Sequence, residues 1–559
     1  MKHHSLRNIP FFGGLDDSVL EAISRRLQRE HYHKGSAVFL EDEPGDCMYV
    51  IETGQVKVVA ERGVQEKIFG YLGPGNFFGE MALLLGERRS ATARVVIDAD
   101  LLVLRKNDFD ELLEIHPQIA LMMSQELGRR LTRSNLSPFL REEFNIVAAL
   151  GAATPTLARN LAQVTGETVC VLDLGGLANI SLDPTSLRQA NVALVRGGDI
   201  LEPEMLADRL SQLVEQYYWV LLAVAPYETP LTLKAIELAD VTVQVGGREP
   251  GWLKTVAPKG YWRVDAESKA IQRLARRISQ RLIGLALSSG NARGMAHIGV
   301  LKVLEEEGIP IDMLAGTSAG AVFGAMYAAG RTIKEMTEFA VYVQKQYNFV
   351  SGFRYWDFRL PPRTGLIKGD GVSKYLRRWV MDKTFDQLNI PLYIIATDLI
   401  SGEEIVFDRG PVADAARASM SVIGVFEPAQ VAGRYLIDGG SVNPVPTQLL
   451  ADKGISIILA SNVIPSLEDR LHRRELKREG KLPNVIGILS GAMEIMESEI
   501  IKSRMGPVDI LIQPDIARYG TLEYDKVNEI IKRGEEAARS QIPAIRQRLA
   551  PNPRKRLRA

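Results

Sequence analysis

The pentapeptide Gly316-Thr317-Ser318-Ala319-Gly320 constrains the fold of this chain more than any other segment. The apolar run before it, 311–315, predicts a buried strand, and the small and apolar residues of 321–329 predict a helix. A serine in a tight turn between a strand and a helix is typical of a nucleophile elbow, whose glycines remove Cβ atoms that would clash. The helix dipole would favour negative charge that develops near Ser318. The alternative, since the motif is short, is a small-residue helix start without chemistry.

Two further segments favour the elbow. Upstream, a short strand at 285–287 enters the loop Gly290-Asn291-Ala292-Arg293, which opens a helix with one apolar face. Such a loop presents free backbone N–H groups, which suit an oxyanion. Downstream, a strand at 435–437 delivers Asp438-Gly439-Gly440. A carboxylate at a strand end, followed by two glycines, can approach another loop closely.

In this order, the three segments resemble the patatin-like phospholipase family over about 285–445, and more loosely to about 538. The resemblance implies a Ser-Asp dyad, with Ser318 as nucleophile and Asp438 as general base, and an oxyanion hole in the loop of Gly290, Asn291, Ala292 and Arg293. The family loop reads Gly-x-Gly-x-x-Gly, but here Ser289 and Asn291 replace two of the glycines. Backbone N–H groups survive these changes, and asparagine tolerates left-handed dihedrals, yet each Cβ narrows the space for substrate.

His297 follows the same loop and invites comparison with a catalytic triad. The family carries a histidine there without giving it the role of base, so we favour a packed structural histidine. No spacing of cysteine, histidine or carboxylate residues suggests a metal site, and we expect none.

The N-terminal third of the chain reads as an all-β module. Short β-like runs at 48–51, 56–59 and 101–104 are separated by glycines, which predicts a barrel or jelly roll. Within it lies a segment in which Gly79 and Glu80 are followed, nine residues after the glutamate, by Arg89-Ser90-Ala91. A glutamate accepts two hydroxyl hydrogen bonds, and an arginine pairs bidentately with phosphate.

This segment resembles the phosphate-binding cassette of cyclic-nucleotide-binding domains, and the match extends to 10–15, 43–46 and closing helices up to about 131. The resemblance implies that Glu80 holds the ribose hydroxyl and Arg89 the cyclic phosphate, with Gly79, Ser90 and Ala91 lining the site. Ser90 in place of threonine favours cyclic AMP over cyclic GMP as an allosteric ligand. A degenerate cassette without ligand is the alternative.

The middle region, 145–283, alternates strands and helices and predicts a parallel α/β sheet. Strands are expected at 147–150, 169–173, 220–224 and 241–245. The segment 151–156 sits where a P-loop would, but lacks the Gly-Lys-Ser/Thr that holds phosphate and magnesium. The region resembles a degenerate ParA/MinD-type fold, and we favour a structural or relay domain over an active ATPase.

Composition bears on the expected partners and compartment of the protein. Acidic and basic residues balance at 68 each, so nothing in the net charge favours nucleic acid. The only two cysteines suggest a reducing compartment without disulfides. The start of the chain leads into no apolar core of a signal peptide, and no uncharged stretch reaches the ~18 residues that span a bilayer. We expect a cytoplasmic protein, free or peripherally at a membrane.

Three segments remain open to interpretation. The aromatic cluster 347–358 is ordinary core or an acyl-binding wall, the charged run 470–479 is a solvated helix or mobile insert, and the basic tail 554–558 could add weak attraction to anionic lipid.

The expected architecture is therefore a multidomain chain: a β-roll cyclic-nucleotide-binding domain (1–135), an α/β domain (145–283), a patatin-like hydrolase domain (285–447) and its C-terminal extension (448–545). A cyclic-nucleotide module ahead of a patatin-like domain resembles the neuropathy target esterase group. This implies a serine esterase of the lysophospholipase or phospholipase type, regulated by a cyclic nucleotide and needing no cofactor for catalysis. The alternatives are a cyclic-nucleotide-responsive regulatory protein with a weak hydrolase domain and, third, a transcription regulator, although no helix-turn-helix follows the module.

Overall fold

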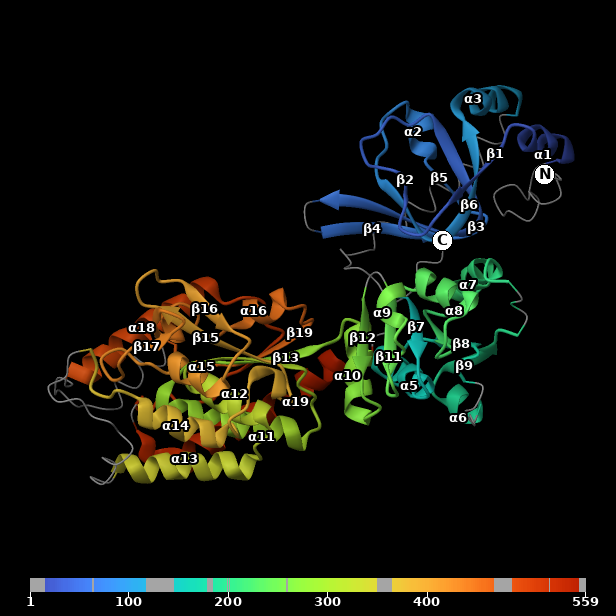
Figure 1. The fold of residues 1–559 in the computed structure, drawn as a ribbon. Coiled ribbons are helices and arrows are strands. Elements are labelled where there is room, and N and C mark those ends of the chain that lie inside the picture. The colour runs from blue at the N-terminus through green and yellow to red at the C-terminus, as the bar shows by residue number, and fades with distance from the viewer. Residues whose placement is uncertain are drawn as a thin grey trace. The chain divides into compact units, whose positions relative to one another are not determined.

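The computed structural model describes residues 16–62, 65–116, 145–177, 184–198, 200, 202–257, 260–348, 364–466, 485–521 and 523–551. The chain divides into two compact units, one up to Ser279 together with the last residues from Pro551, and one from Gln280 to Ala550 (Figure 1). The predicted segments at 10–15, 117–131, 349–358, 470–479 and 554–558 lie outside the described residues.

The first unit begins with an antiparallel β-roll. Its long strands β3 (Cys47–Arg62) and β6 (Thr92–Arg105) pair with each other. Strands β1 (Gln28–Tyr32) and β2 (Ala37–Phe39) pair with β6, while β4 (Gln65–Leu72) and β5 (Phe77–Phe78) pair with β3. Helices α1 (Asp17–Ser24), α2 (Glu80–Leu85) and α3 (Lys106–Ile115) flank the sheet.

Alternation along the two long strands builds the core of the β-roll. Met48 and Val50 of β3 enter one apolar cluster, and Tyr49 and Ile51 enter another. Since side chains of a strand point alternately to opposite faces, both faces of the sheet are covered by apolar packing. The predicted strands at 48–51, 56–59 and 101–104 are confirmed as parts of β3 and β6.

The rest of the first unit is a parallel sheet in the order β12-β11-β7-β10-β8-β9. Its strands are β7 (Ile146–Leu150), β8 (Val169–Leu174), β9 (Val192–Arg196), β10 (Trp219–Val224), β11 (Val241–Val245) and β12 (Tyr261–Val264). Helices α7 (Met205–Gln216), α8 (Pro230–Leu238) and α9 (Leu253–Val256) pack on one face. Helices α5 (Thr154–Thr165), α6 (Pro184–Gln189) and α10 (Ser268–Ile278) cover the other.

These pairings confirm the predicted α/β character of the middle region and its four expected strands. The likeness to a degenerate ParA/MinD-type fold stays a prediction. Gly151, at the end of β7, has φ +115°, and a Cβ there would lie 2.2 Å from the Val245 carbonyl oxygen. The turn that leads into α5 therefore packs directly on the backbone at the end of β11.

The second unit is built on a sheet in the order β17-β18-β15-β14-β13-β19-β20, with β16 on β15. The parallel strands are β13 (Ile283–Leu287), β14 (Met313–Thr317), β15 (Leu392–Asp398), β19 (Ile457–Ser461) and β20 (Ile510–Ile512). The antiparallel strands are β16 (Glu404–Phe407), β17 (Ala429–Val431) and β18 (Arg434–Asp438).

Helices cover both faces of this sheet (Figure 1). One apolar cluster joins the sheet to α11 (Ala296–Glu306), α12 (Ala319–Ala329), α13 (Ile333–Asn348), α14 (Asp370–Trp379), α15 (Val412–Ser419) and α19 (Val527–Leu549). The opposite face packs on α16 (Thr447–Asp452) and α18 (Val485–Arg504). Short 3₁₀ turns are η2 (Asn291–Met295), η4 (Phe385–Gln387), η5 (Gly439–Ser441) and η6 (Tyr524–Lys526).

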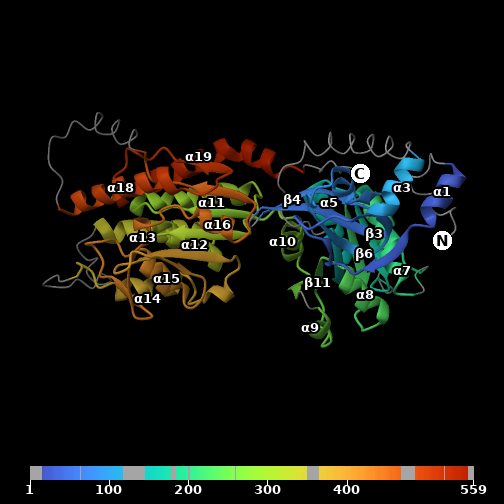
Figure 2. The same cartoon turned by 90° about the horizontal axis from the view of Figure 1, so that it is seen from above.

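Helices α11 and α19 lie side by side (Figure 2). A Cβ at Gly299 of α11 would lie 2.0 Å from the Ile531 carbonyl oxygen, and one at Gly534 of α19 would lie 2.0 Å from that of Ala296. Glycine at both positions lets the two helix backbones touch, which fixes the helix that follows the 290–293 loop.

No helix in the described parts of the chain is both long and apolar enough to cross a bilayer. Both cysteines, Cys47 and Cys170, are buried free thiols. Burial raises the pKa of Cys170 to about 12, which leaves it an unreactive thiol.

Candidate functional site

The turn between β14 and α12 holds Ser318 in a strained conformation. Ser318 has φ +53° and ψ −116°, a region that costs a non-glycine residue on the order of 1–3 kcal/mol. A Cβ at Gly316 would lie 2.6 Å from the Gly320 carbonyl oxygen, and one at Gly320 would lie 2.2 Å from that of Leu287. The glycines on both sides are therefore required by space, as an elbow between strand and helix demands.

Ser318 and Asp438 meet at the carboxyl end of the sheet. The Ser318 Oγ donates a hydrogen bond to Asp438 Oδ2 at 2.6 Å, and both residues are buried, at 3% and 2% exposure. The Gly440 N–H donates to Asp438 Oδ1 at 2.8 Å. Burial raises the pKa of Asp438 to about 6, although these two hydrogen bonds act in the opposite direction.

The register of β15 explains this meeting. Its residues Ile395 and Ala396 pair with Thr317 and Asp438 on either side. A Cβ at Gly439 would lie 2.3 Å from the Ile395 carbonyl oxygen, so the Asp-Gly-Gly segment also packs on β15. The nucleophile and the carboxylate thus project from two strands separated by a single strand.

The loop of residues 290–293 lies beside the elbow, because Leu287 of β13 pairs with Gly316 of β14. The Ala292 N–H donates to the Thr521 carbonyl at 3.0 Å, and the Arg293 N–H donates to that of Gly290 at 3.0 Å. Among the described residues, the N–H groups of Gly290 and Asn291 have no such partner.

Asn291 adopts the left-handed region with φ +49°, which its residue type tolerates better than most. The two N–H groups without a backbone partner therefore belong to Gly290 and to Asn291, whose residue type tolerates the left-handed conformation. At Gly294, a Cβ would lie 2.3 Å from the Ala319 Cβ, so the loop rests directly on the start of α12.

Arg293 is directed away from solvent, with 1% of its side chain exposed. Its Nε donates to the Tyr519 carbonyl at 2.8 Å, and its Nη1 forms an ion pair with Glu494 of α18. Arg293 therefore anchors the loop to the C-terminal part of the unit.

Three partners of the site were not found from the sequence. The Ser419 Oγ accepts a hydrogen bond from the Ser318 N–H at 2.8 Å. In α18, Glu494 contacts Arg293 of the 290–293 loop, and Glu497 contacts Ser289 just before it. Two glutamates three residues apart in a helix rich in apolar residues were the only available signal. Two glutamates at this spacing are equally typical of a solvent-exposed helix face, so the sequence did not distinguish a buried site from an exposed surface.

His297 lies in the core, 0% exposed, with both ring nitrogens engaged. Its Nε2 lies 2.9 Å from the Ser288 carbonyl, so it carries the proton, and Nδ1 then accepts from the Ser461 hydroxyl at 2.8 Å. Burial lowers the pKa of His297 to about 4. The histidine is thus neutral and bonded to neighbouring serine residues rather than to Ser318.

The second predicted site lies in the β-roll, where Gly79 and Glu80 begin α2. Gly79 has φ +81°, and a Cβ there would lie 2.7 Å from Arg89 Nη1. Glu80, Arg89 and Ala91 are buried, while Ser90 is exposed. The structure thus brings Gly79 and Arg89 into contact at the start of this helix.

The Arg89 guanidinium is fixed by its neighbours, but not all of its hydrogen-bond donors are used. Its Nη1 donates to the Gly79 carbonyl at 2.8 Å, and its guanidinium lies 4.1 Å from the centroid of the Phe39 ring. Its Nε is buried and has no hydrogen-bond partner among the described residues. A buried, fixed guanidinium with an unused donor fits an anionic ligand such as a cyclic phosphate.

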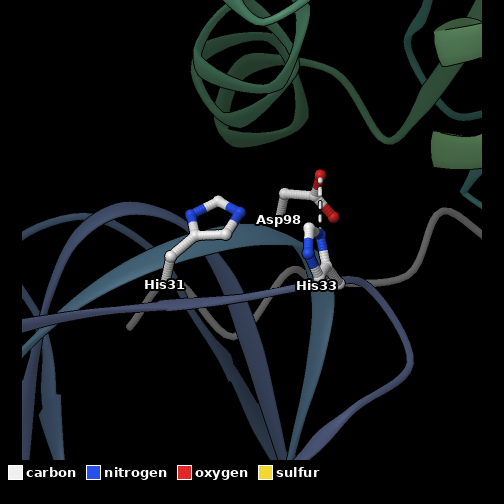
Figure 3. A group of neighbouring side chains, drawn as sticks. All are labelled: His31, His33 and Asp98. Atoms are coloured by element: carbon white, nitrogen blue, oxygen red, sulfur yellow. Dashed lines mark ion pairs between the residues drawn. The ribbon is translucent and has the colours of Figure 1, made fainter.

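One group of potential metal ligands occurs among the described residues: His31, His33 and Asp98 of the β-roll (Figure 3). The Asp98 carboxylate is already engaged, with Oδ1 accepting from the Lys34 N–H at 2.7 Å and Oδ2 from Lys234 Nζ at 2.7 Å. A cation would have to displace the lysine, so the arrangement favours an ion pair over a metal centre.

Comparison with known proteins supports both domain assignments. The family model "Patatin-like phospholipase" matches residues 285–451, and "Cyclic nucleotide-binding domain" matches residues 29–116. An uncharacterized NTE family protein of Mycobacterium tuberculosis is 26% identical, with 97% of this chain and 96% of that protein covered.

Two eukaryotic relatives are much longer than this chain. The human patatin-like phospholipase domain-containing protein 6 is 25% identical over 77% of this chain and 37% of its own length. Lysophospholipase NTE1 of Mycosarcoma maydis is 23% identical over 92% of this chain and 34% of its own length. The expected resemblance is therefore confirmed: the chain carries a patatin-like phospholipase domain and a cyclic nucleotide-binding domain, with relatives of the neuropathy target esterase (NTE) family over most of its length.

Proposed function

We propose that this protein is a serine esterase of the lysophospholipase type, which hydrolyses lipid acyl esters through a Ser318–Asp438 dyad under the control of a cyclic nucleotide. The observation that carries the proposal is the 2.6 Å hydrogen bond between Ser318 Oγ, on a strained elbow, and the buried Asp438. The names of the relatives, patatin-like phospholipase and lysophospholipase, support a lipid ester as substrate.

Asp438 is suited to act as the general base. With a pKa raised by burial to about 6, it is ionised at neutral pH yet basic enough to accept a proton in the transition state. As Ser318 Oγ attacks the ester carbonyl carbon, its proton moves to Asp438 Oδ2. The Gly440 N–H on Oδ1 keeps the carboxylate oriented during this transfer.

The N–H groups of Gly290 and Asn291 are the donors for the resulting oxyanion. Neither is used by the backbone of the described residues, and both lie on a loop held by Arg293 and Gly294. Preorganised donors of this kind are worth ~3–4 kcal/mol each to the transition state.

The cycle closes with the same residues. Asp438 returns the proton to the leaving alcohol as the tetrahedral intermediate collapses to an acyl-Ser318. Water then attacks the acyl carbon and gives up a proton to Asp438. Asp438 returns this proton to Ser318 Oγ as the second tetrahedral intermediate collapses, which releases the fatty acid and restores the serine.

Regulation is assigned to the β-roll. Glu80 would accept the ribose hydroxyl and Arg89 would pair with the cyclic phosphate, with Gly79, Ser90 and Ala91 around them. We favour cyclic AMP over cyclic GMP because Ser90 takes the place of threonine. Lysophospholipid hydrolysis with and without each nucleotide gives the sign of the regulation.

A fluorophosphonate probe tests the proposal directly. The parent protein should be labelled at Ser318, and Ser318→Ala should lose both the label and the hydrolysis of lysophospholipid. Asp438→Asn should lose on the order of 10³-fold in hydrolysis rate, because its amide cannot take the proton. Ser503→Ala, which removes an exposed hydroxyl of α18, serves as the matched control.

Persistent hydrolysis by folded Ser318→Ala would refute the assignment. An unlabelled, inactive parent that still binds a cyclic nucleotide would favour a regulatory protein with a weak hydrolase domain. A loss in His297→Ala as large as that in Asp438→Asn, with the fold retained, would support a triad.

A further inference from the structure

Helix α18 lies outside the segment that the patatin-like phospholipase model matches, yet it contacts the reaction centre. Glu494 and Glu497 are three residues apart and so lie on one face of this helix. Glu494 pairs with Arg293 of the oxyanion loop. Glu497 Oε1 accepts the hydroxyl of Ser289, the residue before Gly290, at 2.6 Å.

Glu497 also packs on the Asp-Gly-Gly segment. A Cβ at Gly440 would lie 2.1 Å from Glu497 Oε1, so a larger residue there would push this carboxyl out of its place. The Gly440 N–H is the group that donates to Asp438 Oδ1. One oxygen of Glu497 thus contacts both the oxyanion loop, through Ser289, and the backbone that orients the base.

This contact gives a reason for the serine that replaces the first glycine of the loop. A glycine at position 289 has no hydroxyl, so Glu497 would be a buried carboxyl without this donor. Glu497 is 8% exposed, and an unsatisfied buried polar group costs about 1–3 kcal/mol. The non-glycine residue and the buried glutamate are therefore complementary.

On the basis of the proposed dyad, we propose that Glu497 is a positioning residue of the active site, which ties the oxyanion loop at Ser289 to the Asp438-Gly439-Gly440 segment. It makes no contact with substrate in this role. It holds the oxyanion donors and the general base in one fixed arrangement.

The charge of Glu497 makes the role measurable. Burial, together with the negative charge of Asp438 and of Glu494, raises the pKa of Glu497 to about 8, while Arg293 and the Ser289 hydrogen bond act in the opposite direction. Between about pH 6 and pH 8, Glu497 is therefore neutral while Asp438 is already ionised. Its ionisation above about pH 8 would add a second negative charge beside the loop whose N–H groups must hold the oxyanion, which opposes catalysis.

The experiment measures kcat/KM for lysophospholipid and the rate of fluorophosphonate labelling from pH 5 to pH 9.5. In the parent, both should fall above about pH 8. In Glu497→Gln, which keeps an acceptor for Ser289 but cannot ionise, this fall should be absent. The ratio of the rate at pH 9 to that at pH 7 should then rise about tenfold over the parent.

Two further variants test the positioning itself. Glu497→Ala, which removes the contact, should lower kcat by at least about tenfold with a smaller change in KM. Ser289→Ala should lower kcat as well, because it leaves Glu497 without its donor. Glu499→Gln, an exposed carboxyl of the same helix, is the matched control and should retain the parent profile.

An alkaline fall that persists in Glu497→Gln, or a Glu497→Ala enzyme with the kcat of the parent, would overturn the inference. Either outcome leaves the dyad intact, provided that the parent is labelled and Ser318→Ala is not. A parent without label would instead refute the proposed function itself.

Discussion

At the scale of single residues, burial decides the chemistry available to each carboxyl group of the site. Asp438 and Glu497 are neighbours in the same core, but Asp438 accepts two hydrogen bonds that favour its charged form. Glu497 faces the charge that Asp438 already carries. Two similar groups are thus driven to different pKa values, about 6 and about 8.

The first prediction concerns the acid limb of the rate profile. Since Asp438 must be ionised to act as base, kcat/KM should be half-maximal near pH 6 and about tenfold lower at pH 5. The profile is obtained by measuring kcat/KM for hydrolysis of a chromogenic ester at each pH, in buffers of constant ionic strength. A half-maximal value below pH 4.5 would contradict the buried base.

The second prediction concerns the nucleotide site. Arg89→Ala should weaken binding of cyclic AMP by ~2–4 kcal/mol, because a buried charge-assisted pair with the phosphate is lost. Isothermal calorimetry on the full chain measures this loss. Arg88→Ala, at the exposed neighbouring arginine, is the control and should bind as the parent does.

Calorimetry that detects no heat with either cyclic AMP or cyclic GMP would reduce the β-roll to a scaffold. Arg89→Lys separates charge from geometry, because lysine keeps the charge without the planar fork. Full retention of affinity in Arg89→Lys would contradict a bidentate contact.

At the scale of elements, the proposed oxyanion loop and Ser289 before it contain two residues that replace family glycines. The Ser289 side chain has an identified partner in Glu497. Asn291 adopts the left-handed conformation that the turn requires, and it is only partly buried. We expect its side chain to narrow the entry and to favour single-chain lipids over bulky diacyl lipids.

The third prediction follows from this geometry. Asn291→Gly keeps the backbone N–H and the left-handed turn but removes the side chain. It should raise the ratio of diacyl to lysophospholipid turnover on the order of tenfold. Parallel assays on a diacyl and a lysophospholipid with the same headgroup measure the ratio. A hundredfold drop for both substrates would instead make the Asn291 amide a catalytic donor.

Elements formed by local patterns were predictable from the sequence. The runs that precede Ser318 and Asp438 are apolar and became β14 and β18, and the helix predicted at 321–329 is α12, which ends at Gly330. The contacts of α18 were not predictable, because its glutamates meet Arg293 and Ser289, about 200 residues earlier in the chain, only in the folded structure.

At the scale of the whole molecule, buried titratable groups couple the stability of the hydrolase unit to pH. His297 is neutral in the folded state, with a pKa lowered to about 4, whereas an unfolded histidine titrates near 6.5. Its contribution to the free energy of unfolding is therefore complete above pH 6.5. It is lost as the pH falls towards 4, because the unfolded chain then binds the additional proton.

The fourth prediction uses this linkage. The difference in unfolding free energy between the parent and His297→Gln should shrink on the order of 1 kcal/mol per pH unit from pH 6.5 to pH 4.5. Urea denaturation at each pH, with the folded fraction measured by circular dichroism at that same pH, measures it. A difference that does not depend on pH would show that His297 is not held neutral.

The sequence by itself determined the identity of the chemical groups and the local structures that carry them. Gly-x-Ser-x-Gly after a buried strand, Asp-Gly-Gly at a strand end, and Glu80 with Arg89 are short-range patterns whose geometry depends on neighbours in the chain. Only the tertiary structure decided which distant groups meet. The register of β15 brings Thr317 and Asp438 together, and Glu497 reaches both Ser289 and Gly440. Burial of that cluster raises the pKa values of its carboxyl groups, and no pattern along the chain encodes how far a group lies from water.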